Sequence, residues 1–251
     1  MYYAPEERFN NERLIDVRKL KFKYVWVDQT GAAKQSGNSE TFRIDFRHEE
    51  EVSVYPDTTV WVRDFNYSHN DPMHENYFWH QAYSDYPVVG VTWHQAMAFC
   101  AYKTKKHNDY LSGRKKKNGV ANKVIDYRLP TEIEWEYAAR GGLQDAPYPW
   151  GGPYLTDDRG CYLANFKPKR GDYIEGQGKG YMYTGPVKTF HANGYGLYDM
   201  AGNVAEWTSS SYDKAFYQMT STLNPTMARD RSDKKAVRGG CLRPHGPLRG
   251  R

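Results

Sequence analysis

The sequence predicts an α+β fold with short strands, two main helices and long loops. Three observations indicate it. Two helix signals each begin at a threonine that can cap a helix, Thr92 and Thr131. Short segments before residue 66 alternate apolar and polar side chains, and a long stretch after Gly142 is rich in Gly, Pro and Tyr without a regular period. Helices and strands in no repeating order are typical of α+β domains.

Composition limits the function classes. The 251 residues, 39% hydrophobic and 26% charged, can bury the core of one large domain or two small ones. Basic residues form runs at 103–106 and 114–117. Such runs either dock an acidic partner or form a solvated helix end and loop, and the second is commoner. No nucleic-acid-binding motif accompanies them, so no nucleic-acid partner is expected.

The first part of the chain is predicted to form strands separated by turns. Three consecutive glutamates, Glu49 to Glu51, predict a solvated turn, and Pro56-Asp57 is a second turn signal. The predicted strands are residues 20–27, 41–46, 52–55 and 58–65.

The first predicted helix begins after Thr92 as its N-cap. Lys103, Lys105 and Lys106 are placed in its last turn, where cations suit the negative end of the helix dipole. Residues 108–122 are predicted to be a basic, flexible insertion. The apolar stripe of the helix is Trp93, Ala96, Met97, Cys100 and Ala101.

The second predicted helix has stronger boundary signals. Pro130 ends an extended segment, because the residue before a proline is disfavoured in helical conformation. Thr131 and Glu134 form a capping box, in which each side chain satisfies a backbone N–H of the first turn. Gly141 and Gly142 supply the left-handed stop.

Cysteine and histidine usage predicts no zinc centre. The three cysteines, Cys100, Cys161 and Cys241, form no C-x-x-C pair, and the eight histidines are scattered. Cys100 lies on the apolar face of the first helix and is expected to be buried. A single disulfide stays open as a possibility in an oxidising compartment.

Several segments between residues 86 and 240 resemble, in order, those of the formylglycine-generating-enzyme (sulfatase-modifying factor) family, whose fold is C-type-lectin-like. The resemblance implies a domain at 86–240 and a fold with short strands, two main helices and long loops. The segments are Tyr86–Trp93, Arg128–Gly142, Tyr148–Gly151, Ala164-Asn165, Gly185–Val187, Asn193–Met200, Gly202–Trp207 and Arg238–Gly240.

The resemblance implies structural calcium. By position, Asp199 and Glu206 would supply carboxylates, and Gly202 and Val204 would supply backbone carbonyls. These hard oxygens suit Ca²⁺. The alternative is that both carboxylates only bond the backbone of a tight loop.

A second family calcium site would use Asn165, the carbonyls of Phe166 and Tyr181, and the position of Lys179. A protonated lysine has no lone pair to give.

The resemblance also indicates where the copper site of active members would lie, and the residues at those positions differ here. Active members bind copper with two cysteines after the Arg-Gly-Gly segment, and the matching positions here are Pro244 and Arg249. Neither offers the soft thiolate that Cu(I) requires. No copper, no other cofactor and no catalytic residue is therefore expected. The tail 241–251 departs from the family and is expected to be divergent or truncated.

Residues 1–85 resemble an insertion found in the K-type lipoprotein (PorK/GldK) of the Bacteroidota type IX secretion and gliding-motility machinery. That resemblance implies a non-catalytic component of a large self-assembling ring with an N-type partner protein. It implies the periplasmic face of the outer membrane, reached through a lipid anchor. This chain shows no targeting signal, so we expect it to be a fragment of a lipoprotein.

Two other classes of function stay open. One is an enzyme: a copper oxidase that makes formylglycine, or a related iron-dependent sulfoxide synthase. The other is a lectin-like module that binds sugar or peptide. The aromatic residues of the insertion bear on the choice, because they either form an exposed partner surface or fold back onto the core. They are Trp61, Tyr67, Tyr77, Phe78 and Trp79.

Overall fold

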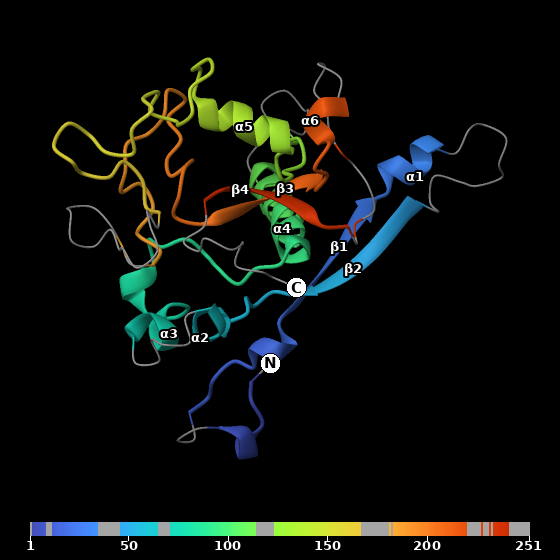
Figure 1. Cartoon of the computed structure of the whole chain (residues 1–251). Coiled ribbons are helices and arrows are strands. Elements are labelled where there is room, and N and C mark those ends of the chain that lie inside the picture. The colour runs from blue at the N-terminus through green and yellow to red at the C-terminus, as the bar shows by residue number, and fades with distance from the viewer. Residues whose placement is uncertain are drawn as a thin grey trace. The chain divides into compact units, whose positions relative to one another are not determined.

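The computed structural model describes residues 2–8, 12–34, 46–64, 71–113, 123–166, 181, 183–219, 227, 231 and 233–240. Within them the elements are few and short, which confirms a mixed α+β fold (Figure 1). Contacts divide the chain into two units, Met1–Pro56 with Thr92–Leu129 and Asp57–Val91 with Pro130–Arg251. No helix within the described ranges has the length and apolar character needed to cross a membrane.

The elements of the described residues are as follows. The helices are α1 (Gln29–Lys34), α2 (Val60–Asp64), α3 (Pro72–Asn76), α4 (Trp93–Ser112), α5 (Glu132–Arg140) and α6 (Phe216–Met219). The strands are β1 (Lys21–Val27), β2 (Arg47–Ser53), β3 (Ala205–Ser211) and β4 (Lys235–Gly239), and short 3-10 turns are η1 (Pro5–Glu7), η3 (Val17–Lys19) and η5 (Gln81–Tyr83).

The first unit contains an antiparallel ribbon of β1 and β2, which confirms the strand predicted at 20–27. The turn predicted at Glu49–Glu51 is wrong, because these residues lie inside β2. Cross-strand partners explain it: the Glu51 carboxylate pairs with Lys21 at 3.0 Å and Lys23 at 3.3 Å. Tertiary pairing thus outweighs the low strand preference of glutamate.

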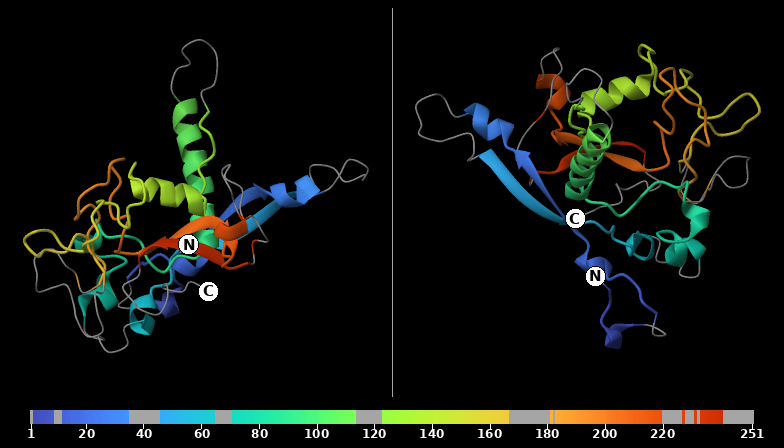
Figure 2. Two further views of the ribbon diagram at one scale, coloured as in Figure 1. Left: turned by 45° about the horizontal axis from the view of Figure 1, so that its top comes forward. Right: turned by 180° about the vertical axis from the view of Figure 1, so that it is seen from behind.

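Helix α4 packs against this ribbon and begins where predicted. The Thr92 hydroxyl accepts a hydrogen bond from the N–H of Gln95, and the Gln95 side-chain oxygen accepts one from the N–H of Thr92, which completes a capping box. The helix continues to Ser112 (Figure 2), so the three lysines 103, 105 and 106 are not in its last turn. The predicted insertion at 108–122 begins as helix, and residues 114–122 lie outside the described part.

The second unit corrects another prediction. Residues 58–65 were expected to form a strand, but Val60–Asp64 is helix α2. The Asp57 carboxylate accepts bonds from both the N–H and the hydroxyl of Thr59, at 2.9 and 2.6 Å, just before the helix begins. Val60 and Trp61 are both buried and the next two residues exposed, which is a helical and not an alternating pattern. Of the other predicted strands, 52–55 ends at Ser53, and 41–45 lies outside the described residues.

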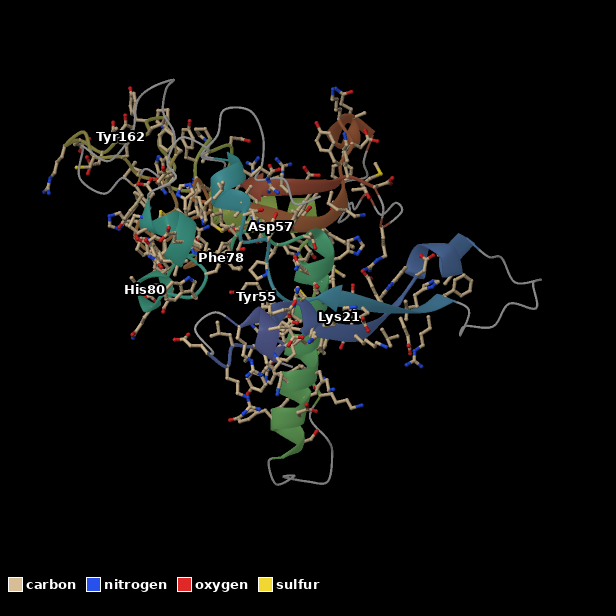
Figure 3. All side chains as sticks on the ribbon, turned by 90° about the horizontal axis from the view of Figure 1, so that it is seen from below. Lys21, Tyr55, Asp57, Phe78, His80 and Tyr162 are labelled. Atoms are coloured by element: carbon tan, nitrogen blue, oxygen red, sulfur yellow. The ribbon has the colours of Figure 1, made fainter. Side chains whose placement is uncertain are left out.

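Most of the insertion's described aromatics fold back into the core of this unit. Trp61 is 0% exposed and packs edge-on against Tyr77 and Tyr183, with centroid distances of 5.0 and 5.7 Å. Phe78 packs against the same cluster. Trp79 alone of the described set is well exposed, at 69%. Figure 3 labels Phe78 and His80 on the segment that follows α3, and Tyr67 lies outside the described residues.

Helix α5 and the β3–β4 pair frame the part of this unit that resembles the enzyme family. Thr131 and Glu134 form the predicted capping box, and Gly141 ends the helix in left-handed conformation with φ of 58°. The Asn193 amide donates to the carbonyls of Ala138 and Ala139, at 2.7 and 3.1 Å, and so satisfies the last turn.

Candidate metal sites and the adjoining cavity

The loop before β3 is curled by left-handed residues. Asp199, Gly202 and Asn203 have φ of 55°, 86° and 62°. A side chain on Gly202 would meet the carbonyl oxygen of Asn165 at 2.3 Å, so this close approach requires glycine.

Asp199 lies in this loop with one carboxylate oxygen unsatisfied. Its Oδ2 accepts a hydrogen bond from the N–H of Lys188 at 2.9 Å. Its Oδ1 is buried and has no hydrogen-bond partner in the described structure. Burying a carboxylate oxygen without a partner costs more than the ~1–3 kcal/mol of a neutral polar group. A bound cation would remove that cost.

Glu206, at the start of β3, is the second predicted carboxylate. Its Oε2 accepts a hydrogen bond from the indole N–H of Trp135 at 2.7 Å. Burial raises the pKa of Glu206, the Trp135 bond lowers it, and the charge of Asp199 raises it again. The negative charges of Asp199 and Glu206 therefore repel each other, and Glu206 is largely shielded from water. A divalent cation between such carboxylates would relieve this repulsion.

The two predicted carbonyl donors belong to the same loop. Gly202 is buried, and the Val204 carbonyl accepts a long hydrogen bond of 3.4 Å from the N–H of Gly240. A carbonyl oxygen has two lone pairs, so this bond leaves one for a cation. Asp199, Gly202, Val204 and Glu206 together fit Ca²⁺, which takes carboxylate and carbonyl oxygens. No group of three His, Cys, Asp or Glu residues gathers within the described ranges, so carbonyls must complete the set.

The second predicted site has its own unsatisfied oxygen. Asn165 is 1% exposed, and its amide nitrogen donates to the carbonyl of Tyr183 at 2.7 Å. Its Oδ1 is buried, with no partner among the described residues. The backbones of Phe166 and Tyr181 are described, whereas Lys179 is not. An unsatisfied Asn165 oxygen fits an oxygen-coordinated cation, with the carbonyls of Phe166 and Tyr181 as the other expected donors.

Asn203 joins the two predicted sites, although it was not among the predicted ligands. Its N–H donates to the Asn165 carbonyl at 2.7 Å, and its Oδ1 accepts from the N–H of Gly185 at 2.9 Å and the Asn165 amide at 3.3 Å. The Gly202-Asn203 pair was a usable signal, because asparagine tolerates left-handed backbone after a glycine turn.

A cavity of about 620 Å³ adjoins this loop. Its walls come from α5, residues 146–149, the loop before β3 and the end of β4. Its charged groups are paired: Arg140 with Glu136 at 2.8 Å, and Arg238 with Glu132. It reaches Gly240, the last residue of the Arg-Gly-Gly segment.

No thiol is among the described lining residues of this cavity. Cys100 and Cys161 are free and half-buried, and burial raises the pKa of the Cys100 thiol. Cys241, Pro244 and Arg249 lie outside the described residues. The two cysteines of the described residues therefore lie outside this cavity.

The chain matches the sulfatase-modifying factor enzyme 1-like domain (FGE-sulfatase) over residues 17–247 and belongs to that family. It is 40% identical over 136 residues to the inactive C-alpha-formylglycine-generating enzyme 2 of Bos taurus, covering 54% of this chain and 36% of that protein. It is 35% identical over 154 residues to the formylglycine-generating enzyme of Mus musculus, covering 60% and 35%. The chain therefore spans about a third of the length of these relatives, which include an active and an inactive type.

Among solved structures, PvdO from Pseudomonas aeruginosa is similar with a TM-score of 0.43 and 23% identity, over 63% of this chain and 51% of that one. That likeness is too low to bear on function. The family membership confirms the resemblance read from the segments between 86 and 240, and the relatives leave the secretion-ring assignment without direct support.

Proposed function

We propose that this protein is a non-catalytic, calcium-stabilised member of the family that acts as a structural component of a type IX secretion and gliding-motility ring. The proposal that the protein is non-catalytic depends on a contrast between the predicted calcium sites and the expected copper site. Buried oxygens of Asp199 and Asn165 have no hydrogen-bond partner among the described residues, which supports an oxygen-coordinated cation. The positions of the copper thiols hold Pro244 and Arg249.

The proposed role in a secretion ring depends on the insertion. Trp61 and Tyr77 build it into the core of the second unit, so it is an integral part of the domain and not an appended loop. Trp79 is left exposed within it, and its indole N–H bonds the Glu75 carbonyl at 2.7 Å, which fixes the ring on the surface. Exposed, oriented tryptophans anchor protein interfaces. The proposed partner is the N-type ring protein, at the periplasmic face of the outer membrane, with a lipid anchor in the parent protein.

One experiment separates the catalytic alternatives. The chain is incubated with copper and a Cys-x-Pro-x-Arg peptide, beside a formylglycine-generating enzyme as positive control. We expect the peptide thiol to remain intact, because a single cysteine near Gly240 cannot form the two-thiolate copper site. Aldehyde above the copper-only background would instead support the copper-oxidase alternative.

A second experiment tests the ring partner. The chain is co-expressed with the N-type protein as native sequence, as Trp79→Ser, and as Tyr154→Ser, an equally exposed aromatic outside the insertion. We expect co-purification to be lost for Trp79→Ser alone, with melting temperatures unchanged in both variants. Equal recovery of the partner by all three chains would place the interface elsewhere, and absence of binding by the native chain would count against the ring assignment.

A further inference from the structure

The β1–β2 ribbon has two outer edges whose backbone groups can be assigned. The N–H of Asp28 donates to the Phe46 carbonyl, and the N–H of Val54 donates to the Leu20 carbonyl. These bonds extend the ribbon's register at both ends, so the even-numbered residues form its hydrogen-bonded pairs. The N–H and C=O groups of the odd-numbered residues therefore point away from the ribbon, along both edges.

Those edges have few partners. The Ser53 carbonyl accepts a bond from the Gln95 side chain at 2.9 Å, which covers one end of the β2 edge. The other odd-numbered residues of β1 (Lys21–Val27) and β2 (Arg47–Ser53) have no further backbone hydrogen-bond partner within the described residues. Val25 and Val27 are 41% and 55% exposed on the face away from α4. Figure 1 shows the two strands (blue) side by side as a ribbon.

The odd positions of the two strands carry opposite charge. Lys21 and Lys23 lie on β1, and both pair with the single carboxylate of Glu51. On β2, Glu49 has no ion pair with a described residue. The β1 edge therefore has surplus positive charge and the β2 edge an unused carboxylate. Arg47 stands at the other end of β2, opposite the uncharged Val27.

We propose that copies of this chain associate head to tail through these edges, with β1 of one copy antiparallel to β2 of the next. Repeating the internal register would place Lys23 beside Glu51 and Val25 beside Glu49 of the neighbour. Pairing two β2 strands in the register centred on Glu50 would instead place Glu49 opposite Glu51, and like charges directly opposite are destabilising. Head-to-tail contacts use different surfaces on each copy and so generate rings or filaments. The inference builds on the self-assembly part of the proposed function and names its contact.

Proline variants test each edge separately. Val25→Pro and Glu49→Pro each remove an outward N–H that the ribbon itself does not use, so the ribbon can stay intact. We expect the mass of the native chain to rise with concentration to multiples of 29.2 kDa and each variant alone to lose this. An equal mixture of the two should regain a species of twice that mass, because each variant keeps the edge that the other lacks. Circular dichroism and melting curves check that both variants fold.

Cysteine variants give a readout that leaves the backbone unchanged. Under oxidation, Val25→Cys chains mixed with Glu49→Cys chains should form a crosslinked heterodimer, beyond what the native chain's own cysteines produce. Crosslinking of Val25→Cys with itself would overturn the head-to-tail arrangement, as would a native chain that stays at 29.2 kDa at all concentrations. A monomeric native chain that still binds the N-type protein would sink this inference alone. Edge association without partner binding would leave it standing and remove the partner assignment.

Discussion

The backbone N–H of Asn203 donates to the backbone carbonyl of Asn165 at 2.7 Å, and this bond joins the loops of both predicted calcium sites. The two asparagine side chains also meet, at 3.3 Å. Loops held this way cannot adjust independently. Binding of a cation at one is therefore expected to order the donors of the other.

Calcium should stabilise the domain through Asp199. At a hundredfold excess over Kd, a ligand that binds only the folded chain adds about 2.7 kcal/mol. Melting in calcium and in chelator should differ, and Asp199→Asn should abolish the difference. Asparagine is chosen because it tolerates the φ of 55° at this position.

Asp145→Asn is the matched control for that experiment. Asp145 also has a left-handed backbone, with φ of 53°, but it is exposed and lies outside the loop. It should keep the full calcium response. Superimposable melting curves of the native chain in both buffers would exclude structural calcium.

Asn203 should be needed for its side chain and not only for its backbone conformation. Asn203→Gly keeps the left-handed backbone but removes the bonds to Gly185, whose N–H is buried. We expect a loss of about 1–3 kcal/mol in unfolding free energy, the cost of unsatisfied buried groups. Urea titration measures it. A variant as stable as the native chain would show that water replaces the amide.

Asp57 should make the start of α2 depend on pH. The Thr59 hydroxyl and N–H and the Arg63 guanidinium hold the pKa of Asp57 below its usual value of 3.8. A lowered folded-state pKa means that the carboxylate stabilises the fold above pH 3.8 and that this stabilisation is lost as the pH falls further.

The measurement compares Asp57→Asn with the native chain. Near neutral pH the variant should be less stable by up to about 1 kcal/mol, because asparagine can keep the bonds from Thr59 but loses the charge that pairs with Arg63. The difference between the two chains should shrink in acid below pH 3.8, where the native carboxylate also becomes protonated. A difference that is independent of pH would assign the effect to side-chain geometry and not to charge.

Truncation of the insertion's two tryptophans, Trp61 and Trp79, should lower the unfolding free energy by very different amounts. Trp61→Ala removes a fully buried ring and should cost about 3–5 kcal/mol. Trp79→Ala removes an exposed ring and should stay within about 0.5 kcal/mol. Equilibrium unfolding of both variants measures this. If both were equally mild, the insertion would not share the core.

The helix starts were predictable because their signals are local. Thr92 and Thr131 each bond backbone within one turn, so four residues of sequence contain the whole interaction. The strand predicted at 58–65 was wrong because the prediction considered the side chains of the segment itself and not the hydrogen bonds just before it. The β-prone side chains of Val60 and Trp61 suggested a strand, while the Asp57 and Thr59 bonds that start the helix lie upstream of them.

The site was predictable only in part. The positions of Asp199 and Glu206 came from family resemblance, and no local pattern could reveal the buried, unpartnered oxygen of Asp199 or the bond from Trp135 to Glu206. The turn at Glu49–Glu51 was predicted wrongly because the tyrosine partner of Glu50 and the lysine partners of Glu51 are distant in sequence. Asn203 was missed because its role consists of contacts with Asn165 and Gly185, which only the fold brings near.

Asn193, which bonds the last carbonyls of α5, is followed by glycine, and this pair has a consequence for how the protein ages. Asparagine before glycine normally deamidates through a ring formed when the next backbone nitrogen attacks the amide. Here the Asn193 amide is held at both ends, by Ala138 and Ala139 on one side and by the N–H groups of Tyr195 and Leu197 on the other. A side chain at Gly194 would meet the Gly141 carbonyl at 2.2 Å, so the backbone there has no room to swing. Chemical damage at Asn193 must therefore wait for the end of α5 to open, and its rate in stored protein reports how often that happens.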